Sequence, residues 1–217
     1  PIEYIQIRIY NVDNNQYWTG SGWAGGEQWP SCTVYTSSWS YSGVSWVSGD
    51  YQITVRGKDT VGPRDLIGYS SVRNFTFDAT PPPTNVINTP QNGDFYNDTL
   101  TSYAGQAVDD KSGVANVYLK IQDLEYPSTY WNGSSWQDSE VWASVSSPFN
   151  PWNYGGANFP TQTEGHKCQL TPKALDNAGN TAIGTSIICY YDNIKPTQTI
   201  TYPEDGGVYG GIVEIKS

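Results

Sequence analysis

Four aspartates in polar turn segments are the residues of this sequence best suited to chemistry. The candidates for a metal site are Asp78, Asp109, Asp110 and Asp176. Carboxylate oxygens are ligands that Ca²⁺ prefers in proteins, so calcium is the one cofactor that the sequence suggests. Aspartates in turns also accept hydrogen bonds from nearby backbone N–H groups, so a purely structural role for these side chains stays open.

Residues that could catalyse a reaction are few. His166 is the single histidine, and we expect it at the exposed start of a strand, with no nucleophile motif beside it. Glu3 and Asp13 are an acidic pair of the type that glycosidases use, but no pattern brings them together. We therefore expect that the protein is not an enzyme.

Two cysteines flank a turn symmetrically. Cys168 and Cys189 are centred on "DNAGN", residues 176–180, so in a simple hairpin they would face each other. Given suitable geometry, a cross-strand disulfide is predicted, and it would place the protein in an oxidising compartment. Two buried free thiols are the alternative. Cys32 has no evident partner, and we expect it to be buried.

Three Asn-x-Ser/Thr triplets are candidate glycosylation sites of a secreted glycoprotein. They begin at Asn74, Asn97 and Asn132. Asn74 precedes Phe75 in a segment that reads as a strand, which makes it the weakest of the three. Such triplets are common by chance.

Charge and composition exclude several partners. The formal net charge is −10, so most of the surface would repel a phosphate backbone, and nucleic acid is not an expected partner. No apolar run reaches the length of a membrane span, so membrane insertion within this chain is not expected. The wealth of Ser, Thr, Asn, Gly and Tyr with little Lys is typical of an extracellular surface protein.

The positions of the tryptophans show an internal repeat. "YWTGSGWAGGEQW" at 17–29 returns as "YWNGSSWQDSEVW" at 130–142. Four tryptophans each recur 113 residues later: Trp18, Trp23, Trp29 and Trp39 return as Trp131, Trp136, Trp142 and Trp152. The period fits one β-sandwich module of about 100 residues, so the chain is a tandem array.

Aromatic residues kept in both repeats are best explained by packing, because a tryptophan buries a large apolar surface. Trp46 and Tyr41 occur in one repeat only, and they are the candidates for stacking on sugar rings. Surface polysaccharide is therefore an alternative partner.

Short alternating runs of Tyr, Trp, Thr, Val and Ile between Gly, Pro, Asn and Asp clusters predict an all-β protein with almost no helix. Turn motifs then punctuate the second repeat. They are an Asp-Pro junction, "P-x-x-G-x-x-Y", "G-x-A-x-D-x-S-G" and "A-x-D-x-A-G-N", at residues 78–83, 90–96, 105–113 and 174–180. This pattern resembles the immunoglobulin-like repeats of bacterial and archaeal surface proteins. The resemblance implies two tandem immunoglobulin-like β-sandwiches of Greek-key type.

In such a sandwich the loops before the third and the last strand lie at the same end, which the preceding linker also reaches. The four aspartates named above would then converge there, similar to the calcium-binding junctions of cadherins.

The repeats are out of phase with the ends of the chain. "PIEYIQIRIY" aligns with the strand at 113–121, and Ile5, Ile7 and Ile9 align with its inward residues. The strands before it are missing, while residues 192–217 repeat residues 78–104. We therefore expect a first domain at 1–79 that lacks two strands, a complete second domain at 80–193, and two strands of a third repeat at 194–217.

This complementarity predicts assembly. A sandwich without its first two strands leaves an open groove and unpaired edges, which the extension of another copy would fill by donor-strand complementation. Ile5, Ile7 and Ile9 are then the acceptor strand, and head-to-tail contacts propagate as a filament. The predicted donor residues are Ile200, Tyr202, Tyr209, Ile212, Val213 and Ile215.

Two alternatives stay open. The sequence is also compatible with a window of one long covalent array, in which neighbouring repeats supply the same strands. A carbohydrate-binding or spacer module of a secreted adhesin or glycoside hydrolase is the other class of function.

Overall fold

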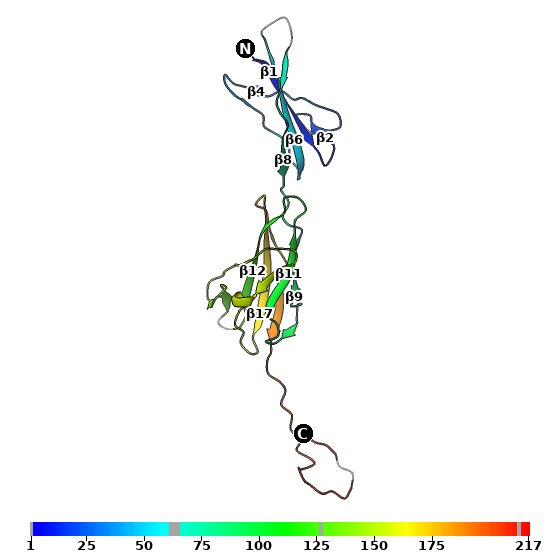
Figure 1. The fold of residues 1–217 in the computed structure, drawn as a ribbon, viewed down its shortest axis with the longest axis vertical. Coiled ribbons are helices and arrows are strands. Elements are labelled where there is room, and N and C mark those ends of the chain that lie inside the picture. The colour runs from blue at the N-terminus through cyan, green and yellow to red at the C-terminus, as the bar shows by residue number, and fades with distance from the viewer. Residues whose placement is uncertain (1, 61–65, 126–127, 212–213) are drawn as a thin grey trace.

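The computed structural model describes residues 2–60, 66–125, 128–211 and 214–217. Its described part is all-β apart from one 3₁₀ turn, η1 (Gly156–Asn158). Figure 1 shows an elongated molecule. We call its strands between residues 2 and 77 the first unit, those between 84 and 191 the second unit, and residues 194–217 the tail. The first unit and the tail lie at opposite ends of the second unit (Figure 1).

The first unit is one large sheet and a separate small one. The large sheet has the order β3-β2-β1-β6-β7, with β8 also paired to β6, and β4 and β5 form the two-stranded sheet. The strands are β1 (Ile2–Asn11), β2 (Gln16–Trp18), β3 (Trp23–Ala24), β4 (Thr33–Val34), β5 (Trp39–Ser40), β6 (Gly49–Asp59), β7 (Ile67–Tyr69) and β8 (Arg73–Phe77).

β1 is the central strand of this sheet, and its apolar and polar residues alternate. Ile5, Ile7 and Ile9 point to one face, where they are buried as the period of two requires. β1 pairs antiparallel with β6 along most of its length, and Ile9 lies opposite Ile53. The core of the first unit therefore lies on one face of this sheet.

The second unit has two larger sheets. One has the order β10-β19-β17-β12-β13-β14, with β15 on β12 and β18 on β17, and the other has the order β16-β11-β9. The strands are β9 (Thr84–Thr89), β10 (Phe95–Tyr96), β11 (Ser102–Val108), β12 (Val114–Asp123), β13 (Thr129–Trp131), β14 (Trp136–Gln137), β15 (Ala143–Val145), β16 (Trp152–Gly155), β17 (Lys167–Asp176), β18 (Thr181–Ile183) and β19 (Ile187–Tyr191).

The two sheets of the second unit enclose one core. Tyr103 and Trp152 from the three-stranded sheet pack in the same buried cluster as Leu119 and Leu170 from the other sheet. β9 and β11 thus lie in one sheet with β16, while β12, β17 and β19 lie in the other. This division of strands is that of immunoglobulin-type β-sandwiches.

The first unit differs in one respect. Among the residues that the structure describes, no strand of the first unit takes the place that β9 and β11 have in the second unit. The small sheet of β4 and β5 stands where β16 joins a three-stranded sheet. The three-stranded sheet of the second unit therefore has no counterpart in the described part of the first unit.

The described residues contain no helix with the length and apolarity needed to cross a membrane.

Candidate functional site

Two tryptophans at equivalent positions of the two units differ in their exposure to solvent. Trp152 on β16 is 1% exposed, and it lies so close to β11 that a Cβ on Gly105 would stand 2.2 Å from its indole. Trp39, at the matching place on β5, is 41% exposed. β5 pairs with β4, and no described strand of the first unit lies beside it as β11 lies beside β16, so Trp39 keeps an exposed side.

The predicted acceptor residues are already buried within the chain itself, so they do not line an open groove as expected. Ile7 and Ile9 belong to the core cluster of the first unit together with Trp18 and Tyr51. Ile5 is also buried on the same face of β1. The structure thus places these isoleucines on the inner face of the sheet.

The two residues proposed for sugar stacking pack against the same core. Trp46 contacts the rings of Tyr51 and Phe75 at centroid distances of 5.0 and 5.3 Å. The Tyr41 hydroxyl accepts a hydrogen bond of 2.8 Å from the Trp18 indole N–H. Both side chains are half-buried because they pack against this core. They therefore do not form a flat, exposed aromatic surface.

The predicted donor residues of the tail are mostly exposed. Ile200 is exposed, Ile215 is 79% exposed, and Tyr209 is at the edge of the exposed class. Tyr202 is half-buried against Tyr209, with ring centroids 5.1 Å apart. Ile212 and Val213 lie outside the described residues.

The carboxylates converge at the junction of the two units, as the sequence predicts for three of the four. Ligand oxygens of Asp78, Asp109 and Asp176 lie within 4.8 Å of one another. Asp110 is exposed and is not part of this group, because its side chain follows Asp109 directly and the turn directs it elsewhere. We call these three residues the carboxylate cluster.

Hydrogen bonds hold two members of the carboxylate cluster. Asp176 Oδ1 accepts from the backbone N–H groups of Ala178 and Asn180, at 2.9 and 2.8 Å. Asp78 accepts from the N–H of Thr80 at 3.0 Å and from that of Ser112 at 3.1 Å. Burial opposes ionisation of Asp78, but its hydrogen bonds with Ser112 and Thr80 outweigh burial and lower its pKa to about 2.

Asp109 is different. Its Oδ2 accepts from the N–H groups of Lys111 and Gly113, at 3.1 and 2.7 Å. Its Oδ1 is buried and has no hydrogen-bond partner among the described residues. An all-oxygen donor set of this kind fits calcium, although most oxygens of the cluster already accept N–H bonds.

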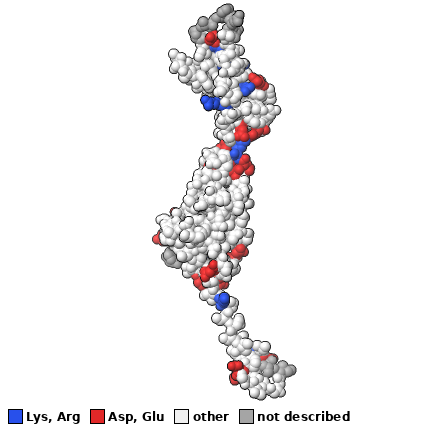
Figure 2. Space-filling model, viewed as in Figure 1, with Lys and Arg blue, Asp and Glu red and all other residues white. Residues whose placement is uncertain are grey.

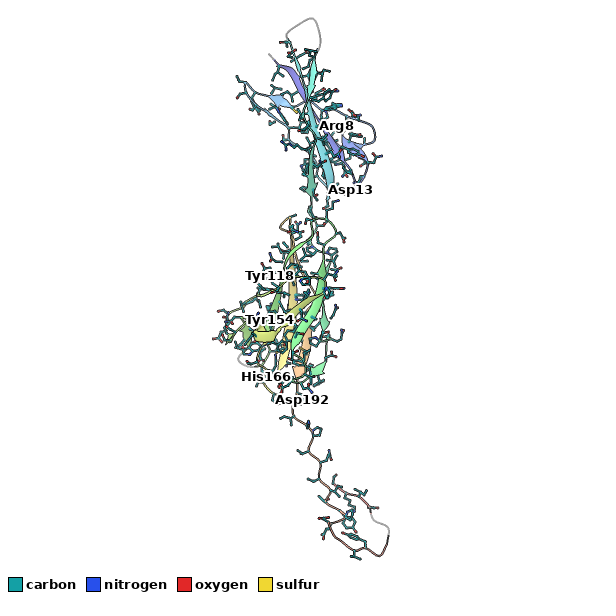
Figure 3. The ribbon with its side chains drawn as sticks, in the orientation of Figure 1. Arg8, Asp13, Tyr118, Tyr154, His166 and Asp192 are labelled. Carbon is teal, nitrogen blue, oxygen red and sulfur yellow. The ribbon has the colours of Figure 1, made fainter. Side chains whose placement is uncertain are left out.

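An ion-pair clamp joins the units beside this cluster, and sequence reasoning missed it. Lys111 Nζ of the second unit lies 2.5 Å from Asp13 Oδ2 and 3.0 Å from Asp50 Oδ2 of the first. These hydrogen bonds raise the pKa of Lys111. Acidic and basic side chains gather at this junction (Figure 2), and Asp13 lies at the end of the first unit that faces the second (Figure 3).

The predicted disulfide is absent, although the two cysteines face each other across neighbouring strands as expected. Cys168 and Cys189 are paired in register between β17 and β19, yet both are buried free thiols. Each sulfur lies 3.7 Å from a separate oxygen, Gln162 Oε1 and the Cys168 carbonyl respectively. Burial raises the pKa of Cys189 to about 12. Cys32 is half-buried and also free.

The structure places the remaining chemical candidates, among the residues it describes, at separate positions. His166 is half-buried, and its Nδ1 lies 2.7 Å from Asp123 Oδ2, so it is not the freely exposed residue that we expected. Glu3 pairs with Lys58 at 2.9 Å. Asp13 belongs to the clamp instead and lies in the turn after β1, whereas Glu3 lies at the start of β1.

All three candidate glycosylation sites are exposed. Asn74 lies within β8, opposite Gln52 of β6. Asn97 and Asn132 lie in turns, where their Oδ1 atoms accept hydrogen bonds from Thr99 and Ser134.

Comparisons with known proteins add little. No protein-family model matches the sequence, and a search of curated proteins finds no match. Among solved structures, the fibronectin(III)-like modules of Clostridium thermocellum CbhA are similar over 89% of this chain and 82% of that chain. The identity is 12% and the TM-score is 0.40, a likeness too weak to bear on function.

Proposed function

We propose that this protein is a structural component of an extracellular or cell-surface fibre, in which the tail completes the first unit of a neighbour. The neighbour is a second copy bound head to tail, or the adjoining part of a covalent array. The exposure of Trp39, set against the burial of Trp152, is the observation that carries the proposal.

The tail has the right sequence for this place. Residues 192–217 repeat residues 78–104, which form β9, β10 and the start of β11 in the second unit. There, β11 lies directly beside β16, with Gly105 opposite Trp152. The same arrangement in a neighbour would set the chain around Ile215 beside β5, the strand that carries Trp39.

The expected gain in free energy is moderate. Burying an exposed Ile side chain contributes about 1.5–3 kcal/mol, whereas association costs an estimated 4–15 kcal/mol. Ile200 and Ile215 together contribute about 3–6 kcal/mol, which offsets only the lower end of that cost. Main-chain hydrogen bonds along the added strands are therefore a necessary part of the contact, as in other β-augmentation complexes.

Two exposed apolar residues of the tail give a matched test. Val208 corresponds to Phe95, which is 73% exposed, and with one residue deleted from the tail between Tyr209 and Ile215, Ile215 corresponds to Tyr103, which is 0% exposed. Ile215→Asp in the full chain is expected to abolish assembly, and Val208→Asp is expected to leave it intact. Light scattering and electron microscopy measure this. Equal assembly by both variants would refute the proposal.

Calcium binding at the carboxylate cluster is a separate proposal, supported by the unpartnered Oδ1 of Asp109. Added Ca²⁺ is expected to raise the unfolding temperature of the wild-type chain and to have no effect on Asp109→Asn. Calorimetry with Ca²⁺ or with EDTA tests this, and equal responses of the two proteins would contradict it.

A further inference from the structure

The tail is already folded back on itself. The Lys216 N–H donates to the Tyr202 carbonyl at 2.9 Å, and the Thr201 N–H donates to the Lys216 carbonyl at 2.9 Å. These bonds make an antiparallel bridge between Tyr202 and Lys216. The two ends of the tail loop therefore lie side by side before any neighbour is present.

This bridge matches the pairing of β9 with β11. In the second unit Thr89 lies opposite Ala104, and these are the positions to which Tyr202 and Lys216 correspond when one residue is deleted between them. A turn bond is shared as well. The Gly207 N–H donates to the Glu204 carbonyl at 3.0 Å, and the Asp94 N–H donates to the Gln91 carbonyl at 3.2 Å.

We infer that the tail docks as a preformed hairpin closed by this one bridge, adding the chain on both sides of the bridge to the first unit of a second copy in one step. This inference rests on the proposed function. The strand around Ile215 would lie beside β5, as β11 lies beside β16, and the strand around Ile200 would form the outer edge, as β9 does. Pairing that exists beforehand lowers the ordering cost of docking.

One side chain of the hairpin has to move. The Tyr209 hydroxyl accepts a hydrogen bond of 2.8 Å from the Glu204 N–H, and its ring packs on Tyr202. Its counterpart Tyr96 packs on Tyr191 of β19 instead, at 5.7 Å. On docking, Tyr209 therefore leaves Tyr202 and packs against Phe77, the residue of β8 that corresponds to Tyr191.

A disulfide across the bridge tests this directly. Tyr202→Cys with Lys216→Cys, in the full chain with Cys32→Ser, places thiols at a hydrogen-bonded pair. The Cα–Cα distance of such a pair, about 5.5 Å, suits a disulfide. The counterparts Thr89 and Ala104 lie outside the buried core, so the substitutions leave Ile200 and Ile215 in place.

The same variant serves as its own control. We expect the oxidised form to assemble at a several-fold lower protein concentration than the reduced form, because the hairpin cannot open. Light scattering of both forms at equal concentration is the measurement. Assembly by the reduced form alone would overturn the inference and leave the proposed function standing. A wild-type chain whose tail never engages a first unit would overturn both.

Discussion

Trp39 and Trp152 hold the same place in their units, but Trp152 has β11 as its neighbour, whereas Trp39 has only β4 beside it among the described strands. We predict that Trp152→Ala destabilises the second unit by about 3–5 kcal/mol, the usual cost of deleting a buried large aromatic side chain. Trp39→Ala is expected to cost much less in the unassembled chain, because its side chain is already 41% exposed. Urea unfolding followed by circular dichroism measures both.

A loss of equal size in the two variants would show that the first unit is as closed as the second. Assembled material supplies the converse check. There, Trp39→Ala should lower stability as well, since the tail then covers that residue.

Asp78 makes a pH-dependent contribution to the junction. Its pKa is lowered from the usual 3.8 to about 2, so its stabilising effect is present above pH 4 and is lost as the pH falls towards 2. Asp78→Asn places an amide N–H₂ against the N–H of Ser112 and should cost about 1–3 kcal/mol at pH 7.

Thermal unfolding of both proteins between pH 2 and pH 7 measures this difference. The gap between them is expected to close at the acidic end. A gap that stays constant over the whole range would show that ionised Asp78 does not support the junction.

At the scale of elements, β17 and β19 bring two thiols together without joining them. All three cysteines of the chain are free in the structure. Burial raises the pKa values of Cys168 and Cys189, so both remain protonated and unreactive in the folded protein. We predict that a thiol reagent labels Cys168 and Cys189 slowly in the folded protein, and that all three cysteines react after unfolding.

Counting thiols in denatured, unreduced protein from its native source distinguishes free thiols from a disulfide. One thiol instead of three would show that Cys168 and Cys189 form the disulfide that the sequence suggests.

The elements that sequence patterns predicted are those set by local residues. The alternation in β1, the turn at 176–180 and the pairing of Cys168 with Cys189 follow from the period of a strand and the centre of a turn. The convergence of Asp78, Asp109 and Asp176 followed from the order of loops in a sandwich.

Other features depend on contacts that no local pattern encodes. Trp29 lies 4.3 Å from the Arg56 guanidinium, and Trp142 lies 4.2 Å from Lys173 Nζ. These cation–π contacts give Trp29 and Trp142 the same role in the two repeats. They form only when the aromatic segment folds back over the sheet. The hairpin of the tail likewise joins residues at both ends of a loop.

At the scale of the molecule, the clamp on Lys111 sets how the two units are joined. Lys111→Gln is expected to leave both cores intact and to broaden the range of angles between the units. Lys195→Gln, in the exposed segment that leads to the tail, is the matched control. Small-angle X-ray scattering compares the two variants with the wild type.

High salt should imitate Lys111→Gln, since screening weakens ion pairs near the surface. The clamp should also persist into alkaline solution, because the raised pKa of Lys111 keeps its charge until the pH exceeds the usual 10.5. Scattering curves that are identical for Lys111→Gln and the wild type would show that other contacts hold the junction.

The central claim is that the tail of one chain lies beside β5 of another. In the second unit Ala104 lies opposite Asn153, the positions to which Lys216 and Ser40 correspond. Chains with Ser40→Cys and chains with Lys216→Cys, each also with Cys32→Ser, are mixed and oxidised. Ser21→Cys, at an exposed loop, replaces Ser40→Cys in the control.

A non-reducing gel measures the product. We predict a cross-linked band of about twice the 24.0 kDa chain mass from the Ser40 and Lys216 pair, and little from the control. Equal cross-linking in both mixtures, or none in either, would contradict the account.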